Sequence, residues 1–161
     1  MRRTLVLAVV TCALTLSIVP AQARYGYTRA DTWARYHHRI AGREGQRGTL
    51  RVWTPVTGST RRVIWSVRNS GTAIPKIHKV TFNGCDDGDG FRFRYLTPDG
   101  KDVTWRVTHD GYVAAAGPFH RAWLNVRVRS TVSGRSYTCV LSGLGNGPAT
   151  SATDVKVRAH S

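Results

Sequence analysis

The chain has 161 residues, with 24 Lys+Arg against 9 Asp+Glu, 41% hydrophobic residues and 3 Cys. The apolar content is too high for an intrinsically disordered chain, and the cysteines are too few for a small disulfide-dense scaffold. The length suits one domain, and the formal net charge of +15 suggests an anionic partner.

The first 23 residues have the three parts of a secretory signal peptide. Arg2 and Arg3 give a positive start, an apolar run covers residues 4–19, and small residues precede a cleavage site after Ala23. The run is shorter than the roughly 20 residues that cross a bilayer, and it leaves too little apolar sequence before Cys12 for a lipoprotein signal. We therefore predict a protein that is secreted, extracellular or associated with the cell wall, with no transmembrane segment after cleavage.

The predicted mature chain carries 22 Lys+Arg against 9 Asp+Glu, a net charge of +13. Its first part, residues 24–48, is rich in arginine and aromatic residues but lacks the alternating apolar pattern of a strand. Trp33, Tyr36 and Ile40 make only a thin stripe at helical spacing. We predict an N-terminal arm here, with at most two helical turns within residues 30–40, that packs partly on the domain or stays mobile.

From residue 49 onward, apolar residues alternate with polar ones, which is typical of half-buried strands. Turn residues separate the alternating stretches at intervals of about ten residues. The stretches are residues 50–52, 63–67, 77–82, 91–95, 103–107, 124–128, 137–141 and 155–157. Seven or eight short strands without a long helix predict an all-β fold, an antiparallel immunoglobulin-like β-sandwich over residues 49–161. An up-and-down barrel is the alternative, because periodicity alone does not separate the two architectures.

Two cysteines remain in the mature chain, Cys85 and Cys139. An even pair in an exported protein predicts one disulfide. The bridge would close a loop of roughly 54 residues and contribute about 4 kcal/mol in the chain-entropy model.

Several short motifs lie on the predicted strands and their ends. They are WSVRNSGTA at 65–73, GFRFRY at 90–95, GKDVT at 100–104, DGY at 110–112 and DVKV at 154–157. In these motifs the chain resembles bacterial secreted and cell-surface immunoglobulin-like modules of the CARDB type. The resemblance implies a β-sandwich that acts as a spacer, adhesion or carbohydrate-associated module, and it implies no catalytic residues.

Arginines occupy the polar positions of two predicted strands. Arg92 and Arg94 must point to one face of their strand, as must Arg127 and Arg129. If the two strands share a sheet, the four side chains form one cationic face. Guanidinium groups pair well with phosphate and carboxylate, so we expect an anionic polymer or the cell-envelope surface as partner, with sequence-independent nucleic-acid binding possible in principle. The alternative is a solvated face of scattered charges.

The tryptophans divide by their phase along the strands. Trp65 and Trp105 are in phase with apolar neighbours, so we expect both in the core. Trp123 is out of phase with Leu124, which predicts an exposed ring beside the arginines, suited to stacking. Alternatively, Trp123 covers a sheet edge or the N-terminal arm.

An acidic cluster, Asp86, Asp87 and Asp89, resembles a fragment of a calcium loop without its remaining ligands. We favour a glycine-rich turn beside the cystine over a cation site. We predict no metal and no cofactor. The sequence does not determine the oligomeric state.

No catalytic motif stands out, so we predict a non-catalytic binding module. A small secreted hydrolase or ribonuclease is one alternative, with His78, His109 and His120 as candidate groups and Glu44 as the single glutamate. A secreted inhibitor or small-ligand carrier is another, presenting a loop at residues 110–118 or 141–149.

Overall fold

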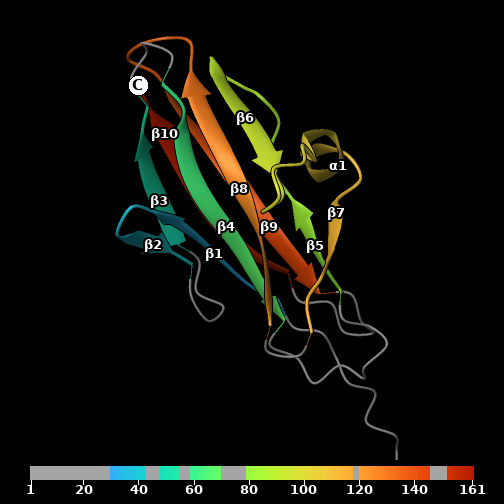
Figure 1. Cartoon of the computed structure of the whole chain (residues 1–161). Helices are drawn as coiled ribbons and strands as arrows, with labels where there is room; N and C mark the ends of the chain where they lie inside the picture. The colour runs from blue at the N-terminus through green and yellow to red at the C-terminus, as the bar shows by residue number, and fades with distance from the viewer. Residues whose placement is uncertain (1–29, 43–47, 55–58, 70–78, 118–119, 146–151) are drawn as a thin grey trace, which may run out of the picture.

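The computed structural model describes residues 30–42, 48–54, 59–69, 79–117, 120–145 and 152–161, with side chains in the last range from residue 156. The predicted signal peptide, residues 1–23, lies outside the described residues, as do Glu44 and His78. Within the described part the molecule is built almost entirely of strands (Figure 1). The elements are β1 (Ala30–Tyr36), β2 (Arg39–Ala41), β3 (Gly48–Trp53), β4 (Arg61–Asn69), β5 (Lys79–Asn83), β6 (Phe91–Leu96), α1 (Thr104–Thr108), β7 (Tyr112–Ala115), β8 (Arg121–Ser130), β9 (Ser136–Gly145) and β10 (Ala152–His160).

The strands form two five-stranded sheets that face each other. Sheet I has the order β2-β1-β4-β8-β6, and sheet II has the order β3-β10-β9-β5-β7. All neighbours are antiparallel except β10 and β3, which run parallel. The predicted all-β sandwich is therefore confirmed, and the barrel alternative is wrong because the strands belong to two separate sheets.

The segment predicted as a loose arm contributes two strands to sheet I, which corrects the expectation of helical turns there. β1 pairs with β4 over six residues and with β2 as a hairpin. Ala30, Thr32 and Ala34 are buried and alternate along β1. Because these inward residues are small and one is polar, the alternation leaves almost no hydrophobic signal in the sequence.

The stretch predicted as a strand at residues 103–107 is instead the short helix α1, and Trp105 is not in the core. Val103 and Val107 are buried, a spacing of four that fits one helical face as well as an alternating strand. The side chain of Asp102 accepts a hydrogen bond from the backbone N–H of Thr104 at 2.8 Å, which favours a turn at this point. Trp105 consequently faces outward with 62% of its surface exposed.

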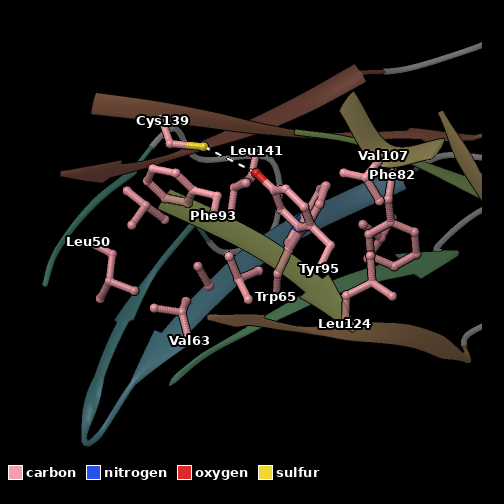
Figure 2. Close-up of a cluster of buried hydrophobic side chains, with 14 of the residues drawn as sticks. Leu50, Val63, Trp65, Phe82, Phe93, Tyr95, Val107, Leu124, Cys139 and Leu141 are labelled. Carbon is pink, nitrogen blue, oxygen red and sulfur yellow. Dashed lines mark hydrogen bonds between the residues drawn. The ribbon is translucent and has the colours of Figure 1, made fainter. Parts of the chain in front are cut away.

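The core lies between the inner faces of the two sheets (Figure 2). Trp65 of β4 is fully buried, as predicted, and meets the rings of Phe82 and Tyr95 edge-on, with centroids 4.8 and 5.9 Å away. Edge-to-face contacts at these distances are favourable for aromatic rings. Valines and leucines of both sheets surround these rings. In the segments that form strands, the apolar residues predicted to point inward are therefore the ones that make up the core.

The predicted disulfide between Cys85 and Cys139 is present, with the two Cα atoms 5.5 Å apart. It joins the segment after β5 to the middle of β9. Tyr95 reaches this bridge from sheet I: its hydroxyl donates to the Cys85 carbonyl at 3.0 Å and accepts from the Cys85 N–H at 3.1 Å. Figure 2 shows the same hydroxyl directed at the sulfur of Cys139, 3.6 Å away. Burial raises the pKa of the Tyr95 phenol, which therefore stays protonated and keeps its donor.

Candidate anion-binding face

Alternation along β6 and β8 places four arginines on the solvent side of sheet I. Phe91, Phe93 and Tyr95 are buried, and Arg92 and Arg94 between them are exposed. On β8, Leu124, Val126 and Val128 are buried, and Arg127 and Arg129 are exposed. β6 lies beside β8 in sheet I (Figure 1). The burial pattern and register of the two strands therefore place all four arginines on one face.

The register brings these side chains directly opposite one another. Arg92 pairs with Arg129, and Arg94 pairs with Arg127. A fifth arginine, Arg62 of β4, is the partner of Arg127 on its other side. Adjacent strands lie roughly 4.8 Å apart, so one row of three arginines crosses three strands beside a second row of two. We name Arg62, Arg92, Arg94, Arg127 and Arg129 the arginine cluster.

Four members of the cluster, together with Thr60, line a shallow groove of about 240 Å³. Arg62 is held at its edge, where its Nε donates to the side-chain oxygen of Asn125 at 2.8 Å. Sequence reasoning did not include Arg62 in the candidate site. The outward direction of Arg62 could be inferred from the sequence, since it alternates with buried Val63. Its place beside Arg127, however, depends on the pairing of β4 with β8, which no local pattern reveals.

Within the described residues, one salt bridge to a carboxylate involves the arginine cluster. Arg94 lies 3.4 Å from a carboxylate oxygen of Asp87. The same oxygen accepts the backbone N–H of Phe93 at 2.7 Å, so this carboxylate also anchors the start of β6. One salt-bridged carboxylate among five guanidinium groups, with Asp102 also within electrostatic reach of Arg94, leaves the groove positive. Like charges placed directly opposite destabilise a sheet.

The acidic turn therefore has a structural task. Asp87 is engaged by β6, and Asp89 stands at the tip of the turn in the left-handed region with φ of 50°. The described residues contain no group of three or more His, Cys, Asp or Glu side chains arranged to hold a metal ion.

A second groove, of about 330 Å³, lies on the same outer face of sheet I. Trp123, predicted to be exposed, is 42% exposed and lies across Ser66 from Trp33 of β1. The guanidinium carbon of Arg121 lies 5.2 Å from the centroid of the Trp33 ring, within cation–π range. We name this the tryptophan groove; its lining is Trp33, Arg35, Ile40, Ile64, Ser66, Arg121 and Trp123.

The tryptophan groove and the arginine cluster are continuous along β8. Trp123 and Arg127 are four residues apart on one side of this strand, roughly 13 Å at the usual rise of a strand. Asn125 lies between them. A ligand that extends along β8 would meet aromatic rings first and guanidinium groups next.

The residues considered for catalysis are not joined by any hydrogen bond or ring contact among the described residues. The ring of His109 stacks on Trp105 with centroids 5.3 Å apart and lies 2.8 Å from the Thr108 hydroxyl. His120 is exposed just before β8 begins, and its backbone N–H donates to the Gly117 carbonyl at 2.9 Å.

The two segments considered as inhibitor or carrier loops are largely strands. Residues 112–115 form β7, and residues 141–145 are the end of β9. The tips at residues 118 and 146–149 lie outside the described residues. The alternative of a presented loop is therefore wrong for residues 112–115 and 141–145, which are strands.

Comparison with known proteins identifies no family. No protein-family model and no curated protein matches the chain. Among solved structures, the N-terminal domain of PorA is similar with a TM-score of 0.44 and 12% identity, covering 80% of this chain and 95% of that one. A conjugative transposon lipoprotein from Bacteroides eggerthii has a TM-score of 0.39 and 9% identity, covering 65% of this chain and 86% of that one. A family 123 glycoside hydrolase from Clostridium perfringens has a TM-score of 0.32 and 8% identity over 70% of this chain and 23% of its own.

Among the described residues, no helix has the length and apolarity needed to cross a bilayer.

Proposed function

We propose that this protein is a non-catalytic binding module, exported to the cell envelope or beyond, that holds an anionic polymer on the outer face of sheet I. The observation that carries the proposal is the pairing of Arg92 with Arg129 and of Arg62 and Arg94 with Arg127. A solvated surface gains nothing from like charges in direct opposition, whereas a ligand rich in phosphate, sulfate or carboxylate is bound by them.

A polymer suits this face better than a single small anion. Arginines two residues apart on one strand are separated by roughly 7 Å and those on neighbouring strands by roughly 5 Å, so several repeating charges can be contacted at once. Each neutralised charge releases counterions, and the binding of several charges should therefore be steeply salt-dependent. The tryptophan groove extends the face with rings on which a sugar or base can stack.

The absence of catalysis is part of the proposal and has its own test. A ribonuclease would need an acid and a base placed together beside the phosphate-binding arginines. We expect the purified mature protein to leave RNA intact on a gel after prolonged incubation. Cleavage that disappears in His109→Ala or His120→Ala would replace the binding module by an enzyme.

Heparin chromatography tests the binding surface. The double variant Arg94→Gln/Arg127→Gln removes two members of the arginine cluster. The matched control Arg106→Gln/Arg135→Gln removes two exposed arginines from α1 and from the connection between β8 and β9. The first variant should elute at clearly lower salt than the control. Equal elution would show that total charge, and not the arginine cluster, governs the interaction.

A further inference from the structure

A separate pocket lies where the tip of the β1–β2 hairpin meets the ends of β3 and β10. Its volume is about 530 Å³, within the usual range for small-molecule sites. The pocket uses the side of the hairpin opposite to the tryptophan groove: Arg35 and Ile40 line the groove, and their neighbours Tyr36 and Arg39 line the pocket. We name it the hairpin pocket.

The hairpin is bent sharply to form one wall of this pocket. Tyr36 and Arg39 are paired, so only His37 and His38 make the turn. His37 lies in the left-handed region with φ of 50°, which is uncommon for a residue other than glycine. Its ring meets that of Tyr36 edge-on, with centroids 4.3 Å apart. The turn thus places an aromatic ring at the wall of the pocket.

Sheet II supplies the other wall. Trp53 and Arg51 are on the outward side of β3, and His160 at the end of β10 is the parallel partner of Trp53. Trp53 remains 61% exposed although it is among the largest apolar side chains of the protein. An aromatic ring left open beside a second one is suited to contact with a planar ligand.

The charges of the hairpin pocket are of one sign. Arg39 and Arg51 line it through their apolar stems, which leaves their exposed guanidinium groups at its rim. Neither makes a salt bridge with a carboxylate among the described residues. Guanidinium groups without a protein partner are available for a bidentate contact with phosphate or carboxylate. The pocket therefore combines two aromatic walls with two guanidinium groups at its rim, which pair with no carboxylate among the described residues.

We propose that the hairpin pocket binds a small planar ring that carries an anionic group. The ring would lie against Tyr36 and Trp53, and the anion would project to the rim, where Arg39 and Arg51 would hold it. This site is additional to the polymer-binding face and does not depend on it, because it uses none of the arginine cluster.

NMR spectroscopy with 1-naphthyl phosphate as probe tests this site. We expect the indole N–H signal of Trp53 to shift saturably, and at lower probe concentrations than those of Trp33 and Trp123. Inorganic phosphate and 1-naphthol, which each carry half of the required chemistry, should bind at least about tenfold more weakly, a difference of roughly 1.4 kcal/mol. The proposal would be overturned if inorganic phosphate or 1-naphthol bound as tightly as 1-naphthyl phosphate, or if the shifts were confined to Trp33 and Trp123.

Matched variants complete the test. Trp53→Ala and Arg51→Gln should each raise the dissociation constant of 1-naphthyl phosphate about tenfold. This is the loss of affinity expected when a single ring or charge contact is removed. Trp105→Ala and Arg106→Gln are the controls, because Trp105 is as exposed as Trp53 and Arg106 is also exposed. Controls that weaken binding as much as the pocket variants would contradict the site. Arg94→Gln/Arg127→Gln should leave naphthyl phosphate binding unchanged, which separates this pocket from the polymer-binding face.

Discussion

Arg94 of β6 lies directly opposite Arg127 of β8 in the antiparallel register of sheet I. On the inner side of the same two strands, Phe93 and Val128 are also paired and buried. One face of this strand pair therefore stabilises the sandwich and the other opposes it. An anionic ligand on the outer face would relieve that opposition, which makes binding and stability two measurements of the same arrangement.

The first prediction concerns the repulsion itself. Arg127→Gln removes the charge that faces both Arg62 and Arg94, so its free energy of unfolding at low salt should rise by about 0.5–1 kcal/mol. Urea unfolding at low and high NaCl measures the effect, which should shrink as salt screens the charges. Arg106→Gln is the control. An Arg127→Gln protein no more stable than the parent at low salt would contradict the account.

The second prediction concerns the tryptophan groove. Trp123→Ala should weaken binding of an oligothymidylate about tenfold, the effect of losing one stacked ring. Binding of inorganic polyphosphate, which has no rings, should change less than about twofold, because the arginine cluster is intact. Fluorescence anisotropy competition provides both values, with Trp105→Ala as the control. Equal losses for the two polymers would show that Trp123 acts only through the shape of the face.

The third prediction concerns the hydroxyl of Tyr95. Tyr95→Phe leaves the N–H and carbonyl of Cys85 without this partner, and it should cost about 1–3 kcal/mol of stability. Because burial raises the pKa of this phenol, the unfolded chain loses its proton first, near the ordinary value of 10.0. Stability of the parent should therefore fall above about pH 10.

The matching variant separates this effect from other alkaline titrations. Tyr95→Phe should show a shallower loss of stability above pH 10 than the parent, measured by urea unfolding at several pH values. A parallel loss in both proteins would assign the alkaline instability to other groups.

The fourth prediction concerns acid. Hydrogen bonding from the Thr97 side chain lowers the pKa of Asp99. Burial acts to raise the pKa of Asp102, but the hydrogen bonds from Thr104 and the charge of Arg94 leave it lowered. Both carboxylates then stabilise the fold above the unfolded value of 3.8, and this contribution is lost as the pH falls below it. Asp99→Asn/Asp102→Asn should flatten the acid limb of stability relative to the parent protein, measured by urea unfolding at several pH values. An unchanged acid limb in the double variant would contradict this assignment.

The sequence predicted those features that depend on local alternation. The burial of Trp65, the exposure of Trp123 and the outward direction of the four arginines follow from the period of two. The cystine followed from counting cysteines. These features need no knowledge of which strands are neighbours.

The remaining features depend on contacts between distant segments. β1 escaped recognition because alanine and threonine occupy its inward positions, and α1 was mistaken for a strand because Val103 and Val107 fit both periods. The place of Arg62 beside Arg127 needs the pairing of β4 with β8. The hairpin pocket unites a turn of sheet I with the edge of sheet II, which no local pattern encodes.

The most direct test of the central claim observes the guanidinium groups themselves. NMR spectra of the arginine Nε–H signals, recorded during a titration with a heparin oligosaccharide, report which side chains meet the polymer. The account predicts that the signals of Arg92, Arg94, Arg127 and Arg129 shift together, and that those of Arg106 and Arg135 do not. Shifts of similar size at all exposed arginines, or none in the arginine cluster, would contradict it.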